Sequence, residues 1–244
     1  SRRSGRYAPA VRVLAGTSGF SFPEWKGAFY PTGLPQARWL AFYAGRLPAV
    51  EVNNTFYRMP SAKTLASWRE QAPASFRFAL KAPQQVTHRL RLRDASDPVA
   101  HFHRVAAELG DRLGPALYQL PPTMKKDLPR LADFLALLPA GARTAFEFRH
   151  VSWFSDDVYD ALRSRNAALC VAESEDLEVP LVATADFGYL RLRREAYGPG
   201  EITAWCERIL DQPWGEAFVF FKHEDPAKGP RLAEAIVALA AASP

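Results

Sequence analysis

Charged and apolar side chains alternate in several short segments of the chain, and the stretch TAFEFRH at 144–150 shows the pattern most plainly. Phe146 and Phe148 take one set of alternate positions, and Glu147 and Arg149 take the other. Because successive side chains of an extended strand point to opposite faces, a strand here would have one apolar and one charged face. A carboxylate and a cation on one face can transfer protons and hold an anionic substrate.

The same alternation places polar residues in other apolar segments. Near the C-terminal ends of these segments, the polar residues that face away from the apolar side chains or end a segment are Glu51, Asn53, Lys81, Gln119, Glu147, Arg149, Arg191 and Lys222. A buried charge without a partner is costly, so these groups must pair with one another or border water. We predict Glu51, Glu147 and Lys81 as catalytic groups and the others as substrate contacts. A purely structural ion network is the alternative.

The elements that must position these residues follow from periodicity. Eight segments rich in branched and aromatic residues predict strands at 11–16, 50–55, 76–81, 116–120, 144–149, 168–173, 187–192 and 217–222. Helical periodicity lies between them at 35–47, 61–72, 98–112, 127–138, 154–166, 201–211 and 229–242. The link between the sixth and seventh strands is short and interrupted by proline, so we expect a turn or a reduced helix there.

Eight strands alternating with helices predict an α/β fold, a single (β/α)8 TIM-type barrel. A doubly wound open sheet is the alternative, but GTSGFS at 16–21 lacks the glycine spacing of a dinucleotide-binding turn. In a barrel the apolar set of each strand faces the helices and the polar set faces the barrel axis. The polar residues would then gather at the C-terminal ends of the strands, where barrel active sites are built.

Composition agrees with one folded domain over 11–244, preceded by a flexible arm over 1–10. The 244 residues are 48% hydrophobic and 12% aromatic, and the net charge of +5 permits anionic partners without requiring them. No apolar run is long enough for a membrane span and no signal peptide is visible, so we expect a cytoplasmic protein. Cys170 and Cys206 have the spacing of neither a disulfide framework nor a zinc site, and we expect both reduced and buried.

Aromatic and basic residues are frequent in the segments that follow the first, second, third and fifth strands. Aromatic rings can stack on bases or sugars while cations meet phosphate. We therefore predict further substrate contacts from Trp25, Tyr57, Arg58, His88, His150 and Trp153. The alternative for the long first loop is that its aromatic side chains pack as a small core of their own.

Metal ligands are few. His88, His150 and His223 follow strands, and with nearby carboxylates such as Glu173 and Asp225 they could hold one divalent ion, but a cluster of three ions would lack ligands. No zinc-type HExxH or CxxC pair is present. We expect no required cofactor, because glutamates with neighbouring cations suffice for acid–base chemistry. A Schiff base on the third-strand lysine is a weaker alternative.

Five long motifs occur in a fixed order. They are GTSGFSFPEWKGAFYP (16–31), VEVNNTFYRMPSAKTLASW (50–68), LGPALYQLPP (113–122), FEFRHVSWF (146–154) and TADFGYLRLR (184–193). Together they resemble the family called domain of unknown function 72, the YecE-like proteins, from about residue 12 to the end. The resemblance implies a β/α barrel and suggests nucleic-acid binding by likeness to barrel endonucleases, but it supplies no established reaction. FFKHEDPAKGP at 220–230 departs from an asparagine-rich turn of many relatives.

The predicted function is an enzyme acting on an anionic, phosphate-bearing substrate at the C-terminal mouth of the barrel. DNA or RNA is the favoured substrate, through phosphodiester hydrolysis or processing of damaged sites. One alternative is a small-molecule hydrolase, lyase or isomerase acting on a sugar or sugar phosphate, and another is a non-catalytic nucleic-acid-binding protein. A closed, narrow pocket would favour a small molecule, and an open basic groove would favour nucleic acid. Neither a membrane nor a protein partner is predicted.

Overall fold

The computed structural model describes residues 11–173, 177–222 and 227–243. The predicted arm over 1–10, and His223 and Asp225, lie outside the described residues. No helix in the part of the chain that is described is long and apolar enough to cross a membrane.

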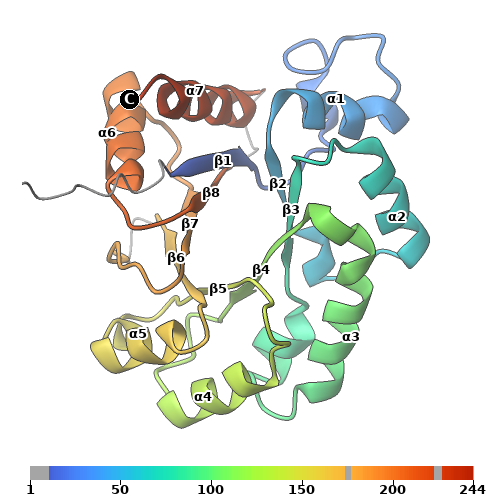
Figure 1. Ribbon diagram of the computed structural model, residues 1–244. Coiled ribbons are helices and arrows are strands. Elements are labelled where there is room, and N and C mark those ends of the chain that lie inside the picture. The colour runs from blue at the N-terminus through green and yellow to red at the C-terminus, as the bar shows by residue number, and fades with distance from the viewer. Residues whose placement is uncertain (1–10, 174–176, 223–226, 244) are drawn as a thin grey trace, which may run out of the picture.

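Eight parallel strands form the centre of the molecule (Figure 1). In chain order they are β1 (Arg12–Thr17), β2 (Ala49–Val52), β3 (Arg77–Lys81), β4 (Leu113–Gln119), β5 (Thr144–Glu147), β6 (Ala168–Ala172), β7 (Phe187–Leu192) and β8 (Glu216–Phe221). Each strand pairs with its neighbour in sequence except at the seam, and β8 pairs with β1. At the seam β1 and β2 meet through an isolated parallel bridge between Ser18 and Glu51, which nearly closes the barrel.

Helices surround the strands on the outside, as Figure 1 shows in a view along the barrel. They are α1 (Trp39–Arg46), α2 (Ala62–Gln71), α3 (Ser96–Ala106), α4 (Leu128–Leu137), α5 (Asp156–Arg163), α6 (Pro199–Leu210) and α7 (Lys228–Ala242). Between β6 and β7, residues 177–186 contain no helix, in agreement with the reduced connection predicted there. The predicted TIM-type barrel is confirmed.

Capping residues begin two of the helices, α2 and α4. The side chains of Ser61 and Asp127 each accept a hydrogen bond, 3.1 Å long, from the backbone N–H three residues later. The helix predicted over 98–112 is shorter than expected, because the α-helix ends at Ala106 and the chain continues as a 3-10 turn. Gly110 lies in that turn with φ of 53°, a conformation that breaks the helical path and that glycine adopts without strain.

The core has two layers, one inside the barrel and one between the strands and the helices. Val50, Phe146 and Leu190 lie in the outer layer, which confirms the predicted direction of the apolar set. The inner layer contains Leu14, Ala49, Ala79, Leu117, Ala145, Ala168, Cys170, Ala172, Phe187, Tyr189, Phe218 and Phe220. Its alanines leave room for the large rings, so the interior below the mouth is packed rather than open. Both cysteines are buried and form no disulfide.

Candidate functional site

Three cavities lie around the C-terminal ends of the strands. One of about 420 Å³ lies beside the ends of β7 and β8 and the start of α7. A second, of about 180 Å³, lies at the ends of β5, β6 and β7, and a third, of about 390 Å³, lies at the seam between β1 and β2. Each of these cavities is lined by some of the predicted site residues.

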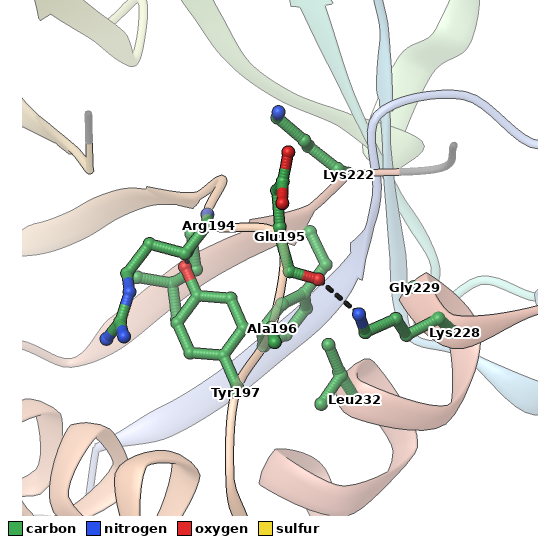
Figure 2. Close-up of a pocket in the computed structure, with 10 residues that line it drawn as sticks. Arg194, Glu195, Ala196, Tyr197, Lys222, Lys228, Gly229 and Leu232 are labelled. Carbon is green, nitrogen blue, oxygen red and sulfur yellow. Dashed lines mark hydrogen bonds between the residues drawn. The ribbon is translucent and has the colours of Figure 1, made fainter. Parts of the chain in front are cut away.

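Lys222 lines the first cavity, and Figure 2 shows it there with Glu195, Tyr197 and Lys228. The Lys228 ammonium donates a hydrogen bond to the backbone carbonyl of Glu195 across this cavity (Figure 2). Lys222 follows β8, so it lies at the predicted end of the barrel. It forms part of the wall of this side pocket.

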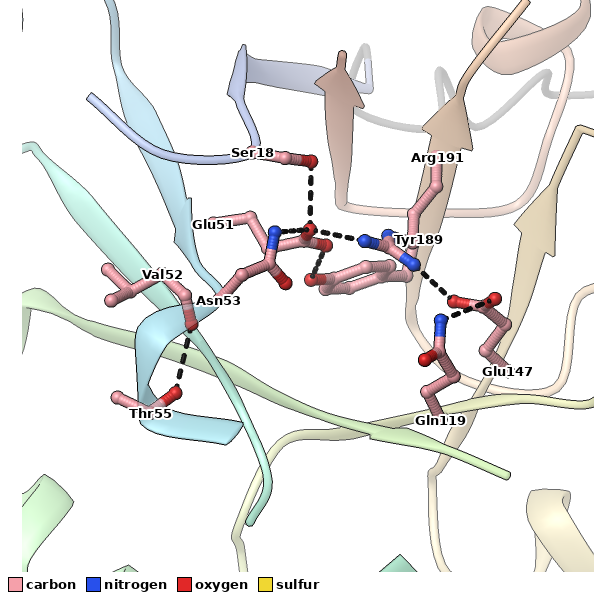
Figure 3. A network of polar contacts seen from close by, with 9 residues as sticks. All are labelled: Ser18, Glu51, Val52, Asn53, Thr55, Gln119, Glu147, Tyr189 and Arg191. Atoms are coloured by element: carbon pink, nitrogen blue, oxygen red, sulfur yellow. Dashed lines mark hydrogen bonds and ion pairs between the residues drawn. The ribbon is translucent and has the colours of Figure 1, made fainter. Parts of the chain in front are cut away.

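The centre of the mouth holds an ion network of three buried residues. The Arg191 guanidinium donates to Glu51 Oε1 at 2.8 Å and to Glu147 Oε2 at 2.6 Å (Figure 3). Side-chain exposure is 2% for Arg191, 0% for Glu51 and 4% for Glu147. Strands β2, β5 and β7 supply one residue each, because their alternation points these side chains to the barrel axis. The sequence therefore predicted correctly that these three side chains point to the barrel axis.

Glu51 is saturated with hydrogen bonds. Besides Arg191, its carboxylate accepts from Ser18 Oγ (2.9 Å), Asn53 Nδ2 (3.1 Å) and Tyr189 OH (2.8 Å). Burial acts to raise the pKa of the Glu51 carboxyl, but the charge of Arg191 and these hydrogen bonds outweigh it and hold that pKa below its usual value. This geometry does not favour the proton-transfer role predicted for Glu51. It fits a residue that positions Arg191.

Glu147 has fewer partners and borders the second cavity. Its Oε1 accepts from Gln119 Nε2 at 2.8 Å, and its Oε2 accepts from Arg191. The predicted contact residue Gln119 therefore orients a carboxylate. Glu147 is the member of the network that a ligand in the 180 Å³ cavity would meet.

Lys81 ends β3 beside the same network. Its ammonium lies 4.2 Å from the centre of the Phe56 ring, and it has neither a hydrogen bond nor an ion pair with any residue that the structure describes. Burial, together with the charge of Arg191, lowers the pKa of the Lys81 ammonium to about 8, although Glu147 and Glu51 oppose that shift. The Lys81 amine can therefore gain and lose a proton near neutral pH.

Two arginines border the 180 Å³ cavity together with Glu147 and Glu173. Arg149 is exposed, Arg193 is half-buried, and neither forms an ion pair within the described residues. The Arg193 Nε is buried without a hydrogen-bond partner there, and so are Arg191 Nε and Asn53 Oδ1. Trp214 Nε1, which lines none of the three cavities, is a fourth such atom, so these atoms do not by themselves mark a ligand site.

His88 lies near Lys81 and at the edge of the charged mouth. Its ring meets the Phe56 ring edge-on at 5.0 Å, and its Nδ1 lies 2.8 Å from Thr87 Oγ1. Burial, and then the charges of Lys81 and Arg149, lower the pKa of His88, so the ring is neutral at pH 7. His88, predicted as a substrate contact, therefore lies near the charged mouth as a neutral side chain.

Trp25 and Trp153 are not available to a substrate, contrary to prediction. Trp25 is fully buried in the first loop, where Tyr43 stacks on it and Phe29 meets it edge-on. Trp153 is also fully buried, and it stacks on Phe148 at 4.6 Å. Both rings belong to the outer core layer between the strands and the helices and do not form a separate core of the loop. Rings of this size stabilise the fold most when they leave water.

The remaining predicted contacts lie at the rim. Tyr57 is 75% exposed and Arg58 is exposed beside it, so both are accessible. His150 uses its Nδ1 to accept from the Ser152 backbone N–H at 3.2 Å, which caps a short 3-10 turn. These three residues do not contact the central network.

Glu173 is a mouth residue that the sequence suggested only as a metal ligand. Its carboxylate accepts hydrogen bonds from Tyr197 OH and from Trp205 Nε1, the latter at 3.2 Å, and it lines the 180 Å³ cavity. Its position directly after the sixth strand was a visible signal. Within the described residues no group of three or more His, Cys, Asp or Glu side chains could hold a metal ion.

Comparisons with known proteins agree with this architecture. The chain is 34% identical over 134 residues to UPF0759 protein YecE of Escherichia coli (strain K12), covering 50% of this chain and 49% of that protein. It is 26% identical over 141 residues to UPF0759 protein YunF of Bacillus subtilis (strain 168), covering 54% and 50%. The matches thus span about half the length of these curated relatives.

Solved structures show the same fold. A DUF72 family protein from Thermotoga maritima MSB8 superposes with a TM-score of 0.81 at 28% identity, covering 93% of this chain and 98% of that one. One from Enterococcus faecalis V583 has a TM-score of 0.79 at 18% identity, covering 95% and 96%. The family model described as "Protein of unknown function DUF72" matches residues 14–244. The chain therefore belongs to the DUF72 family.

Proposed function

We propose that this protein is an enzyme that performs acid–base chemistry on a small anionic substrate at the C-terminal mouth of its barrel, with the Lys81 amine as the proton-transfer group. One observation supports this above all. The amine, with a pKa of about 8 and no ion pair in the described residues, lies beside the buried network of Glu51, Arg191 and Glu147.

An amine with a pKa near the working pH is present in both protonation states. Its neutral form can accept a proton from a substrate C–H or O–H, and the resulting ammonium can return it. The surroundings of Lys81 lower its pKa, because burial and the charge of Arg191 disfavour the ammonium form. The carboxylates of Glu147 and Glu51 limit this decrease. Perturbed groups in clefts are candidates for catalysis for this reason.

The same mouth favours a negative substrate. Among the described residues there, four cationic side chains, Lys81, Arg149, Arg191 and Arg193, face three carboxylates, of Glu51, Glu147 and Glu173. Of these four cations, only Arg191 forms ion pairs with residues that the structure describes. Arg149 and Arg193 can therefore bind an anionic group in the adjacent cavity and stabilise negative charge that develops during reaction.

Cavity size favours a small molecule over a nucleic acid strand. The space between Arg149, Arg193 and Glu147 is about 180 Å³, which suits one charged group of a ligand. Nucleic acid is the second candidate, supported by Tyr57 and Arg58, which are exposed at the rim where a base could stack and a phosphate could bind. If the protein binds nucleic acid without catalysis, its affinity should fall steeply as the salt concentration rises, and no substitution should change a reaction rate.

The amine can be tested before any substrate is known. Acetic anhydride reacts with a neutral amine, so the extent of Lys81 acetylation measured by mass spectrometry across pH reports its pKa. We expect half-maximal reactivity near pH 8, with protection by added phosphate. A midpoint near the usual lysine value, or no protection, would contradict the proposal. A screen of small phosphorylated and carboxylated compounds for turnover, with Lys81→Met as control, then tests catalysis itself.

A further inference from the structure

The cavity of about 390 Å³ occupies the seam of the barrel. It lies where β1 and β2 are joined by the isolated Ser18–Glu51 bridge instead of a ladder, with α2 on its outer side. Ligand pockets for small molecules are about 300–1,000 Å³, so this space can hold most of a small ligand, whereas the 180 Å³ cavity at the ends of β5, β6 and β7 cannot.

The seam cavity differs from the mouth in having no ionisable side chain in its lining. The residues that matter for its chemistry are Ser18, Phe20, Phe22, Asn53, Asn54 and Trp68. Three of these are aromatic and three bear neutral polar groups. A charged group would lose its hydration here without gaining a counter-ion, so the cavity selects an uncharged one.

Its aromatic walls are held by the core. The Trp68 ring stacks on Phe78 at 5.9 Å and meets Phe20 edge-on at 6.0 Å, while Phe22 packs on the buried Trp25 at 4.9 Å. Phe20, Phe22 and Trp68 each remain partly exposed. Rings fixed from behind lose little entropy when a ligand packs against them.

Its polar wall is shared with the ion network. Ser18 and Asn53 both line the cavity and both donate to Glu51, so a ligand there contacts the residues that hold the network (Figure 3). The Asn53 amide uses its N–H on Glu51, and its Oδ1 is buried without a partner within the described residues. That oxygen has almost no accessible surface, so a ligand in the cavity would hydrogen-bond to the exposed Asn54 amide and Ser21 hydroxyl.

We propose that the seam cavity binds an uncharged, hydroxylated ring of the sugar type. The C–H faces of such a ring pack on the aromatic walls, and its hydroxyls hydrogen-bond to the Asn54 amide and the Ser21 hydroxyl, both exposed in the lining. This inference adds a sugar-binding site to the proposed function and does not depend on the anion site.

Nuclear magnetic resonance titration tests this with defined probes. Glucose, ribose and myo-inositol are compared with their monophosphates, with inorganic phosphate, and with tetrahydropyran, which has the ring without hydroxyls. We expect at least one sugar to shift the side-chain amide signals of Asn53 and Asn54, phosphate to shift the Arg193 Nε signal, and the matching sugar phosphate to shift both. Tetrahydropyran should shift the amide signals less than the sugar does.

A blocking variant provides the matched control. Ser21 is exposed and lines the seam cavity, so Ser21→Trp should fill it and weaken sugar binding by about tenfold or more through lost packing and hydrogen bonds. Phosphate binding at Arg193 should not change. Ser67→Trp, on an exposed position of α2 outside the lining, should leave both responses intact.

The outcomes separate the two proposals. If phosphate shifts Arg193 but no sugar or sugar phosphate shifts Asn53 and Asn54, the sugar assignment is wrong and the proposed function stands. If phosphate shifts nothing and acetylation of Lys81 has the usual lysine pH dependence, the proposed function fails. A sugar response that survives Ser21→Trp would also overturn the assignment to this cavity.

Discussion

Two ion networks of opposite composition lie at the two ends of the barrel. At the C-terminal mouth one arginine, Arg191, joins two glutamates. At the N-terminal end one glutamate, Glu216, accepts from Arg12 at 3.2 Å and from Arg143 at 2.7 Å. The first network is almost fully buried, whereas the side chains of the second are 48% exposed for Arg12, 32% for Arg143 and 23% for Glu216.

The two networks differ in what their charges contribute to stability. Exposed ion pairs contribute about 0–1 kcal/mol, and the N-terminal network also caps the packed interior, since Arg143 lies 4.4 Å from the Phe187 ring centre. Buried ion pairs must overcome the desolvation of each charge, and apolar residues of similar size often stabilise a protein more. The barrel keeps charges at its mouth at this cost, next to an amine and cavities, which is consistent with a site.

The largest expected effect is the loss of stability in Arg191→Met. This change leaves the buried carboxylates of Glu51 and Glu147 facing each other without their cation, so we expect about 3–5 kcal/mol less free energy of unfolding at pH 7. Urea denaturation followed by circular dichroism measures it. The deficit should shrink at acid pH, where the two carboxyls become neutral. A loss equal at pH 7 and pH 4 would contradict the role assigned to charge.

Lys81→Met should have the next largest effect, and it should fall on activity. If the amine transfers the proton, turnover of a substrate found by screening should fall about 10²- to 10⁴-fold while the free energy of unfolding at pH 7 does not fall. Lys81→Arg is the matched control because it keeps the charge but has no neutral form at pH 8. An active Lys81→Arg enzyme would show that only the positive charge matters.

The same lysine predicts a pH dependence of stability. Its pKa is about 8 in the folded protein against 10.5 as the ordinary value, so between these values the unfolded chain binds more protons. The free energy of unfolding of the native protein should therefore rise with pH across this window, relative to Lys81→Met. Urea titrations of both proteins at pH 7.5, 8.5 and 9.5 give the difference. A constant or falling difference would oppose the lowered pKa.

Glu147→Gln should produce a smaller electrostatic change at the same site. The Glu147 carboxylate opposes the lowering of the Lys81 pKa, so its removal should move the acetylation midpoint of Lys81 below about 8. Glutamine keeps the shape of the side chain and an oxygen for Arg191. Glu216→Gln, at the far end of the barrel, is the control and should leave the Lys81 midpoint unchanged.

Sequence alone predicted the fold and the inward direction of Glu147 and Arg191, because alternation along a strand is a local property. It could not show that Glu51 would be saturated, since Ser18 follows β1, Tyr189 lies in β7 and Arg191 lies 140 residues away in the chain. Pairing of that kind depends on the closed barrel. Residue types at strand ends therefore locate a site but do not assign roles within it.

The aromatic loops show a different limit. Trp25 and Trp153 have the composition of a binding surface, yet both are buried, whereas Tyr57 is exposed. Hydrophobic burial and substrate stacking use the same side chains, so only tertiary packing distinguishes them. The seam cavity was missed for the same reason, because Phe20 and Trp68 come from different elements of the chain.

The smallest expected effect is that of Glu216→Gln on stability, and it completes the comparison between the two ends. Because its partners are exposed, we expect a change below about 1 kcal/mol, which added salt should reduce further by screening. The measurement is urea denaturation at low and high ionic strength beside Arg191→Met. A loss as large as that of Arg191→Met would mean that burial does not govern the cost of breaking these networks. The stability cost would then no longer support the proposal that the site lies at the mouth.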